Sequence, residues 1–295
     1  MDRIIEVENL TYSYGKNLAV DHISFFINKG EILGFLGPNG AGKTTTFKML
    51  IGLLKPKDGK VNVLGFDMSK DAKKVQTKIG VCFEYTNLYE ELSAKENLEL
   101  FSKFFGVKNF NPFEILEKVG LKGKENDLVK TFSKGMKQRL MVARAIVNDP
   151  EVLFLDEPTA GLDPVSSEEI RNIILEEKRR GKTIFLTTHD MYEADKLSDR
   201  VAFINYGKIV ALDTPFNLKQ KFGKRSLKFK LLKENGEIYE KEVTLDKDDT
   251  LEKVLNTFKM EKILTLHSEE ATLEDIFIKI TGRGLKEWIL KIFLF

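Results

Sequence analysis

Short apolar runs alternate with amphipathic segments over the first two thirds of the chain. The runs are rich in Val, Ile, Leu and Phe, which is typical of strands buried on both faces. The predicted strands are Ile32–Leu36, Lys78–Phe83, Val152–Leu155, Thr183–Thr187 and Arg200–Ile204. Helical spacing predicts one helix from Gly135 to Asn148 and another that starts after Asp163-Pro164 and ends near Gly181. This alternation predicts an α/β layer fold.

Two regions depart from the alternation. Residues 87–148 are charged and mostly helical, and they interrupt the series of core strands as a helical lobe would. After Asp213-Thr214-Pro215 a basic stretch leads to a strand, an Asn235-Gly236 hairpin signal, a second strand and an amphipathic helix. A last strand and a helix, Leu273–Ile280, follow. We therefore expect a large domain over residues 1–215, a small α+β domain over residues 216–282 and an apolar tail, residues 283–295.

Composition and charge narrow the choice of partners. The 295 residues are 42% hydrophobic and 31% charged, which is enough to bury a large core. The net charge of +2 gives no overall field that would select nucleic acid or an anionic membrane. The single cysteine, Cys82, excludes an internal disulfide and suits a reducing compartment. No segment has the ~18 to 20 uncharged residues that cross a bilayer, so we expect any membrane crossing to belong to another polypeptide.

A phosphate-binding loop follows the first buried strand and precedes a predicted helix, Thr44–Leu53. Its residues, all predicted to bind nucleotide, are Gly37, Pro38, Asn39, Gly40, Ala41, Gly42, Lys43, Thr44 and Thr45. Glycines let successive backbone N–H groups point at phosphate oxygens, and the helix N-terminus favours an anion. Lys43 would reach the β- and γ-phosphates, and the Thr44 hydroxyl would ligate Mg²⁺. The sequence thus predicts binding of a nucleoside triphosphate with Mg²⁺, and ATPase activity.

Two further segments carry candidate chemistry. The strand Val152–Leu155 runs into Asp156 and Glu157, which we predict to serve as the metal-side carboxylate and the general base. Ser133-Lys134-Gly135 begins an amphipathic helix, where the N–H groups and helix dipole offer a second anion site. Taken alone, Ser133 is better explained as a helix cap than as part of an anion site.

These motifs, in this order, resemble the nucleotide-binding subunit of ABC transporters over about residues 1–215. The resemblance implies a P-loop NTPase core with an N-terminal antiparallel β subdomain and a helical subdomain, about residues 87–148. It also implies that Tyr14 stacks on adenine, that Ser133 and Gly135 contact the γ-phosphate held by an opposing subunit, and that His189 acts as the switch histidine. Ala160-Gly161-Leu162-Asp163 resembles the D-loop.

The same resemblance implies the partners. Two subunits, as a homodimer or a heterodimer, would enclose two ATP molecules with Mg²⁺ and drive a separate membrane permease from the cytoplasmic face of the membrane. Coupling helices of the permease would dock near residues 84–92 and the helical lobe, where Tyr85, Leu88 and Tyr89 are candidate contacts or else pack locally. No nucleic-acid partner is expected.

Two departures from the family pattern bear on the site. Glu84 stands where the Q-loop normally has Gln; it still offers an oxygen to Mg²⁺ but adds a negative charge near the triphosphate. The signature reads Phe-Ser-Lys-Gly-Met, so Lys134 replaces a glycine, and its ammonium could reach phosphate or ribose. This variant, with the later segment Leu273-Glu274-Asp275-Ile276-Phe277, resembles subunits of the ABC-2 export group. The resemblance then extends to about residue 282 and implies an exporter.

Alternatives remain at this stage. A soluble ABC ATPase acting on ribosomes or nucleic acid is favoured only by the basic stretch Lys219–Lys230, which we interpret as a solvated linker because no aromatic platform accompanies it. A small-molecule kinase would leave the signature segment, the D-loop and His189 unexplained. The tail, residues 283–295, could lie at a membrane interface, on a partner or on its own domain.

Overall fold

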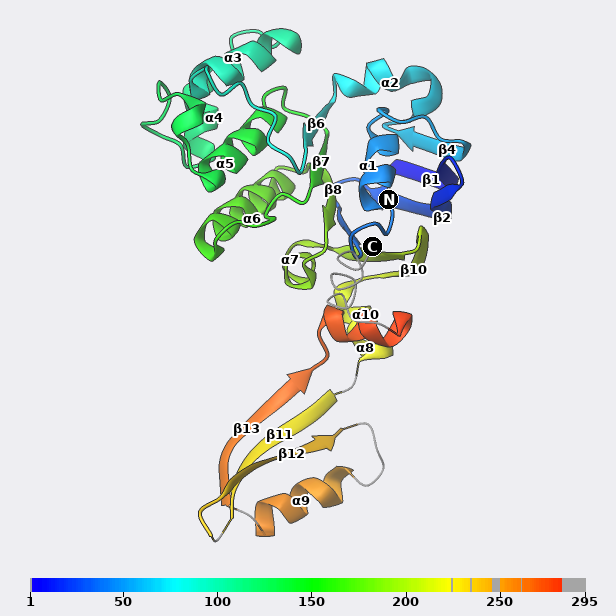
Figure 1. Cartoon of the computed structure of the whole chain (residues 1–295), viewed down its shortest axis with the longest axis vertical. Coiled ribbons are helices and arrows are strands. Elements are labelled where there is room, and N and C mark those ends of the chain that lie inside the picture. Colours follow the sequence, from blue (N-terminus) through cyan, green and yellow to red (C-terminus); the bar gives the residue numbers. More distant parts are fainter. Residues whose placement is uncertain (1, 224, 234, 246–249, 261, 283–295) are drawn as a thin grey trace. The chain divides into compact units, whose positions relative to one another are not determined.

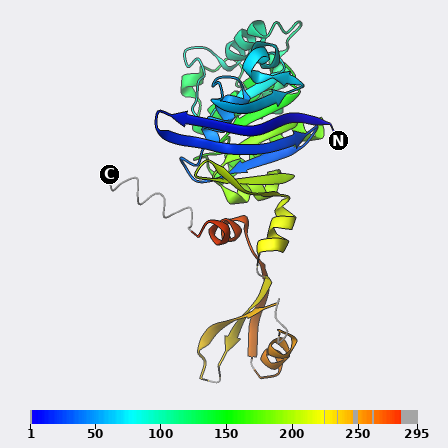
Figure 2. The same ribbon diagram turned by 90° about the vertical axis from the view of Figure 1, so that its right-hand side faces the viewer.

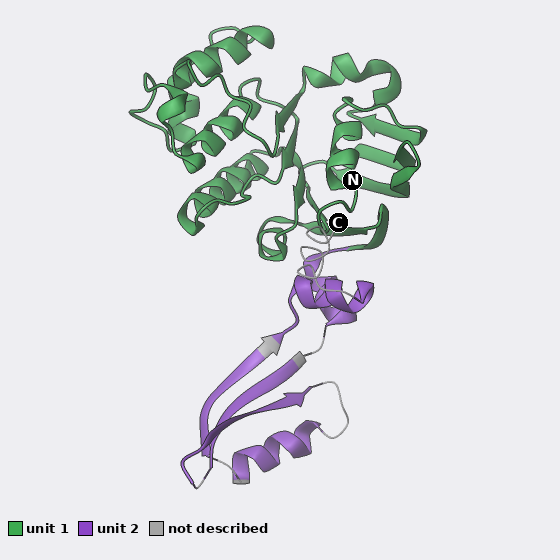
Figure 3. Cartoon of the chain, in the orientation of Figure 1, with its two compact units in different colours: residues 1–212 green, residues 213–295 purple. Residues whose placement is uncertain are grey.

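The structure is a computed structural model that describes residues 2–223, 225–233, 235–245, 250–260 and 262–282. The chain forms two compact units, residues 1–212 and 213–295 (Figure 3). The predicted tail, residues 283–295, lies outside the described residues. Among the described residues, no helix is long and apolar enough to pass through a bilayer.

The first unit is a mixed α/β unit with two sheets (Figure 1). Its elements are β1 (Arg3–Tyr14), β2 (Asn17–Asn28), β3 (Ile32–Leu36), α1 (Lys43–Leu50), β4 (Asp58–Val63), β5 (Phe66–Asp67), α2 (Met68–Gln76), β6 (Ile79–Cys82), α3 (Ala94–Phe104), α4 (Pro112–Lys118), the 3₁₀ helix η1 (Val129–Thr131), α5 (Lys134–Ala145), β7 (Val152–Asp156), α6 (Pro164–Arg179), β8 (Thr183–Thr188), α7 (Met191–Leu197), β9 (Arg200–Asn205) and β10 (Lys208–Asp213).

The larger sheet has the strand order β10-β9-β3-β8-β7-β6, in which β3 pairs with β8 and β9, two strands distant from it in sequence. β3, β7 and β8 are buried along their whole length, as their continuous apolar runs predict. They pair in parallel, with Leu36 opposite Thr188 and Asp156 opposite Thr187. Their carboxyl ends therefore share one edge, where ligands bind in open α/β sheets.

The smaller, antiparallel sheet has the order β2-β1-β4-β5, and Figure 2 shows β1 and β2 as two long neighbouring strands. Helix α1 packs between the two sheets through Phe47, which is fully buried. The Phe47 ring centroid lies 6.2 Å from that of Phe154 and 6.5 Å from that of Phe185. This core anchors the helix whose N-terminus follows the phosphate-binding loop. The antiparallel β subdomain implied by the resemblance is confirmed.

The helical lobe contains α3, α4 and α5, which pack on one another around buried residues such as Leu98, Leu116 and Leu140. Its first helix is fixed by a capping box: the Ser93 hydroxyl accepts from Glu96 N, and the Glu96 carboxylate accepts from Ser93 N. Helix α5 lies against β6 of the large sheet. The lobe and the core thus meet where α5 packs on β6 and on α6.

Gly80 of β6 is the point of closest approach in that junction. A Cβ at Gly80 would lie 1.9 Å from the Ala145 carbonyl oxygen and 2.7 Å from Leu153 Cδ2. Because the nearest atom is backbone, we expect Gly80→Ala to reduce the free energy of unfolding by about 3 kcal/mol and Tm by roughly 6 to 12 °C. Thermal unfolding of the purified protein measures both. Gly123→Ala, whose Cβ would meet no atom within 4 Å but whose φ is +82°, is the control; it should cost only ~1 kcal/mol. Equal melting temperatures for the two variants would contradict this account.

The second unit consists of α8 (Pro215–Phe222), β11 (Arg225–Leu232), β12 (Ile238–Thr244), α9 (Thr250–Met260), β13 (Lys262–Glu270) and α10 (Leu273–Thr281). Its three strands form an antiparallel sheet in the order β12-β11-β13 around buried Phe229, Leu231 and Val243. The predicted Asn-Gly turn connects β11 to β12, with Gly236 at φ +84°. The α+β prediction is confirmed.

The linker interpretation of Lys219–Lys230 is wrong. Its first residues end α8, and its last residues form β11. The basic composition hid the apolar position Phe229, which is 0% exposed. In β11, Lys228 and Lys230 stand opposite Glu242 and Glu240 of β12. Such cross-strand pairs of opposite charge stabilise a sheet.

Candidate functional site

The phosphate-binding loop connects β3 to α1 and needs its glycines for conformation and space. Gly42, at the N-cap of α1, has φ +111°, and a Cβ there would lie 2.5 Å from the Ala19 carbonyl oxygen. A Cβ at Gly37 would lie 2.2 Å from the Ile204 carbonyl oxygen. Any larger residue at these positions would push the loop away from β2 and β9, so the loop is shaped by its neighbours as well as by its own backbone.

A cavity of about 240 Å³ lies over this loop. It gathers residues from β1 and β2, from the phosphate-binding loop and α1, and from the segments that follow β6 and β7. The lining residues are Tyr14, Asn17, Ala19, Pro38, Asn39, Gly40, Gly42, Lys43, Thr44, Thr45, Glu84 and Glu157. Most of the residues predicted to bind nucleotide are therefore brought together.

Some positions differ from the simple sequence picture. Asn17 and Ala19 were missed, because only the β1–β2 register, with Tyr14 opposite Asn17, carries the start of β2 to the cavity. Ala41 is 2% exposed and its side chain belongs to the apolar core, so its predicted contact with nucleotide would be made by its backbone. Tyr14 is 49% exposed, and its ring meets the Tyr12 ring edge-on at 4.9 Å between centroids. Tyr14 thus lines the cavity with about half of its surface exposed.

Lys43 is buried at the floor of the cavity. Its ammonium donates to the Gly37 carbonyl oxygen at 2.7 Å and to that of Pro38 at 3.4 Å. It also forms an ion pair with Glu157, with 3.2 Å between Nζ and Oε1. The side chains are only 6% and 7% exposed, so both charges interact in a medium of low dielectric constant. A phosphate bound in the loop would share the Lys43 ammonium with Glu157 and the two carbonyl groups.

Glu157 follows β7 and is held in an unusual backbone conformation, with φ +49°. Its N–H donates to the Thr187 carbonyl oxygen at 3.0 Å, and its Oε2 lies 2.8 Å from His189 Nδ1. Burial opposes ionisation, yet the hydrogen bond with His189 and the charge of Lys43 outweigh it, so the pKa of Glu157 is lowered. The same hydrogen bond raises the pKa of half-exposed His189. An ionised carboxylate is the form that a general base requires.

Asp156 is 2% exposed at the end of β7 and accepts a hydrogen bond from the Thr187 hydroxyl. Burial raises its pKa, and the nearby negative charges of Glu157 and Glu84 add to this effect. Glu84 itself is exposed at the cavity wall. Its negative charge thus acts on Asp156 at the sheet edge, an effect that sequence reasoning did not consider.

Comparison with known proteins agrees with this geometry. The model of the ABC transporter family matches residues 20–160. Over 287 residues the chain is 44% identical to a fluoroquinolones export ATP-binding protein of Mycobacterium tuberculosis (strain CDC 1551 / Oshkosh), covering 96% of this chain and 94% of the relative. The chain is an ATP-binding protein of the ABC transporter family. It is also 38% identical to the bacitracin transport ATP-binding protein BcrA of Bacillus licheniformis, over 96% of this chain and 99% of the relative.

Solved structures of ABC proteins share the fold. An ATP-binding subunit of an ABC transporter superposes with a TM-score of 0.68 and 29% identity, covering 74% of this chain and 93% of the other. A dimeric ATP-binding cassette in a post-hydrolysis state, bound to ADP and Pi, gives a TM-score of 0.66 and 27% identity, covering 71% of this chain and 98% of the other. ATP binding and ATPase activity, both predicted from the sequence, follow from this membership.

The signature segment of this ABC protein lies outside the ATP cavity of its own chain. Ser133 caps α5 by accepting from Met136 N at 3.2 Å, so the capping role is present. Gly135 packs on Ser166, because a Cβ there would lie 2.4 Å from its Oγ. Lys134 donates to the carbonyl oxygens of Ala160 at 2.9 Å and Gly161 at 3.0 Å. In this structure its ammonium contacts the D-loop, a partner that sequence reasoning did not consider.

Proposed function

We propose that this chain is the ATP-hydrolysing subunit of an ABC exporter that pairs with a second ATPase subunit and drives a separate membrane permease. The observation that carries the proposal is the cavity where the phosphate-binding loop, Tyr14 and Glu157 meet. His189 is hydrogen-bonded to Glu157 there. Several relatives are named for export: fluoroquinolones export in Mycobacterium tuberculosis and Nod factor export in Burkholderia orbicola. They support the direction of transport proposed here.

Each cavity residue has a distinct role in this proposal. The loop N–H groups and Lys43 hold the phosphates, and Tyr14 stacks on adenine at the rim. Glu157 accepts a proton from the attacking water as general base, and His189 orients the Glu157 carboxylate through the 2.8 Å contact at Nδ1. The lowered pKa of Glu157 supports the first of these roles, because it keeps the carboxylate ionised.

The donor set suits Mg²⁺ bound together with phosphate. Among the described residues there is no group of three or more His, Cys, Asp or Glu side chains that could hold a metal by itself. Mg²⁺ in nucleotide sites uses one or two carboxylates, with phosphate oxygens and water completing its shell. We propose the Thr44 hydroxyl and Asp156 as its protein partners, with Glu84 at the cavity wall as a third oxygen donor. When bound, Mg²⁺ neutralises charge on the β- and γ-phosphates.

A second subunit explains why Ser133 and Gly135 are absent from the residues that line the cavity of their own chain. Ser133 is exposed at the N-terminus of the 12-residue helix α5, where the helix dipole favours an anion. In a head-to-tail pair this end of α5 would contact the γ-phosphate held by the other subunit. The dimeric ADP- and Pi-bound cassette among the similar structures supports such a pair.

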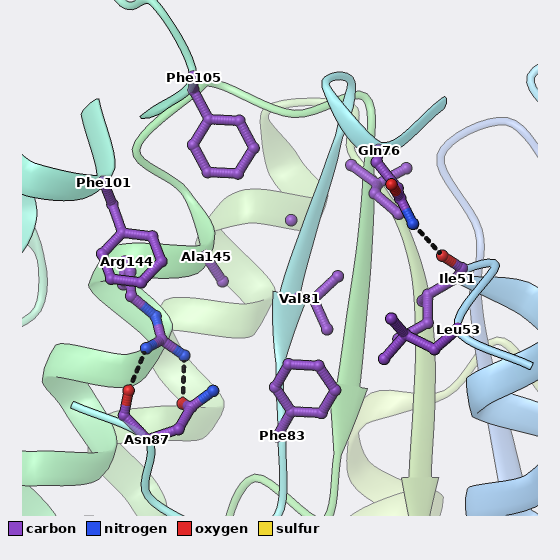
Figure 4. A pocket seen from close by; sticks show the side chains of 12 residues that line it. Ile51, Leu53, Gln76, Val81, Phe83, Asn87, Phe101, Phe105, Arg144 and Ala145 are labelled. Atoms are coloured by element: carbon purple, nitrogen blue, oxygen red, sulfur yellow. Dashed lines mark hydrogen bonds between the residues drawn. The ribbon is translucent and has the colours of Figure 1, made fainter. Parts of the chain in front are cut away.

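We propose that a permease helix docks over a second, mostly apolar cavity of about 260 Å³. Figure 4 shows Phe101 and Phe105 of the helical lobe near Val81 and Phe83 of the β6 segment. Arg144 closes one wall and donates to Asn87. Tyr85 and Tyr89 follow β6 in the chain and are 79% and 50% exposed. Leu88 instead packs on the core of the lobe, so we assign it a local role. Docking here would place the protein at the cytoplasmic face of the membrane.

Co-purification tests the proposal. The chain is tagged at its N-terminus, native membranes are solubilised gently with ATP and Mg²⁺ present, and the bound proteins are identified. We expect a multi-spanning membrane protein, and reduced recovery with Phe105→Arg. Phe113→Arg, which changes an exposed aromatic outside the cavity, is the matched control. Recovery of ribosomal or DNA-bound material without any permease would refute the proposal in favour of a soluble ABC ATPase.

Glu84→Gln is expected to keep or raise the affinity for ATP. The substitution removes one negative charge from the cavity wall and retains an oxygen for Mg²⁺. An exposed charge of this kind is worth about 1 kcal/mol or less, so we expect an increase of roughly fivefold at most. Titration with a fluorescent ATP analogue measures it, with Glu91→Gln on the neighbouring loop as control. A large loss of both binding and turnover would contradict the view that the charge is unfavourable.

A further inference from the structure

Two successive residues of the signature segment contact the D-loop of the same chain and the helix that follows it. The Lys134 ammonium donates to the carbonyl oxygens of Ala160 and Gly161, at 2.9 and 3.0 Å. The next residue, Gly135, packs against Ser166 in the first turn of α6. Within one chain, Lys134 therefore contacts the D-loop, and Gly135 contacts the start of helix α6.

A lysine is suited to the first of these contacts. The carbonyl groups of Ala160 and Gly161 lie in the turn between β7 and α6, where Gly161 has φ +65°. An ammonium has three donors and can serve both oxygens at once. Hydrogen bonds from a charged donor are stronger than those between neutral groups. Side chains at the start of a helix point toward its N-terminus, which directs Lys134 at this turn. A glycine at position 134 could not make the contact.

The D-loop in turn is hydrogen-bonded to the backbone of the proposed general base, Glu157. The Ala160 N–H donates to the Glu157 carbonyl oxygen at 3.1 Å, and the Leu162 N–H donates to that of Thr159 at 3.2 Å. At its end, Asp163 caps α6 by accepting from Val165 N at 3.1 Å and from Ser166 N at 3.0 Å. Displacement of Ala160 would therefore shift the backbone of Glu157, whose carboxylate faces Lys43 and His189.

We propose that Lys134 is a positioning residue that holds the D-loop of its own subunit and, through it, keeps Glu157 in the geometry that hydrolysis requires. This inference rests on the proposed function of Glu157. Lys134 does not line the ATP cavity of its own chain, so its removal acts on turnover and leaves ATP binding to the single subunit unchanged. The family pattern has glycine at this position, so the lysine of this chain adds a contact within the subunit.

Amide hydrogen exchange tests the contact between Lys134 and the D-loop without ATP hydrolysis. In the purified chain, Lys134→Met should raise amide exchange in the peptide Thr159–Asp163 by about fivefold, because the turn loses its ammonium donor. Lys134→Arg, which keeps charged donors, should restore slow exchange. Lys122→Met removes an exposed lysine that pairs with Glu117 and serves as the control. Unchanged exchange in Lys134→Met would overturn the proposal.

Steady-state kinetics then test the consequence. Lys134→Met should lower kcat by about tenfold, while the Kd for an ATP analogue stays within about twofold of the wild-type value and Lys134→Arg recovers most of kcat. Faster exchange with an unchanged kcat would overturn the positioning role. So would a loss of ATP binding equal to the loss of kcat. A wild-type chain that hydrolyses no ATP would refute the proposed function, and the exchange experiment would still decide whether Lys134 holds the D-loop.

Discussion

Glu157→Gln is expected to reduce kcat for ATP hydrolysis by about a hundredfold to a thousandfold, because the amide cannot accept the proton of the attacking water. Its size and its contact with His189 are retained, so ATP should still bind. The lowered pKa of Glu157 means that the wild-type side chain is ionised at neutral pH, and the substitution therefore removes a charge as well as a base. Phosphate release under saturating ATP measures the effect.

The same variant should accumulate as an ATP-bound pair. If hydrolysis separates the two subunits, blocking it stabilises the closed form, and size-exclusion chromatography with ATP and Mg²⁺ should show a shift to the dimer. Glu151→Gln, an exposed residue at the other end of β7, is the matched control. Turnover within threefold of the wild type in Glu157→Gln would exclude it as the general base.

Lys43→Met should weaken ATP binding by about thirtyfold to several thousandfold. Truncating one member of a buried, hydrogen-bonded charge pair costs about 2 to 5 kcal/mol, and Lys43 is the only buried cation that lines the ATP cavity in the described part of the chain. Competition with a fluorescent ATP analogue measures Kd. Lys48→Met changes an exposed lysine of the same helix and should bind ATP normally.

A loss of folding must be separated from a loss of binding in Lys43→Met. The substitution leaves Glu157 buried without its ammonium partner, although the contact with His189 remains. A buried charge that loses its partner is destabilising, so the melting temperature is measured for each variant without nucleotide. A folded Lys43→Met protein that binds ATP within threefold of the wild type would contradict the assignment of Lys43 to the phosphates.

The fold was predicted well wherever a local pattern decides it. Buried runs such as Ile32–Leu36 and Val152–Leu155 became the central strands β3 and β7. The Asn235-Gly236 pair marked its hairpin, since few residues adopt the positive φ that such a turn needs. The basic stretch Lys219–Lys230 was misread because its basic residues outnumber its buried apolar residue, Phe229.

The sequence by itself determined the chemistry of the phosphate-binding loop, the two carboxylates at the end of β7 and the family, because each depends on short runs of neighbouring residues. Only the tertiary structure decided which distant residues meet. Strand order β3-β8-β7 brings Lys43, Glu157 and His189 together, and the β1–β2 register adds Asn17 to the cavity. The ammonium of Lys134 reaches carbonyl groups 26 and 27 residues away. A long side chain can take many partners, and strand order and helix packing, which no local pattern encodes, select among them.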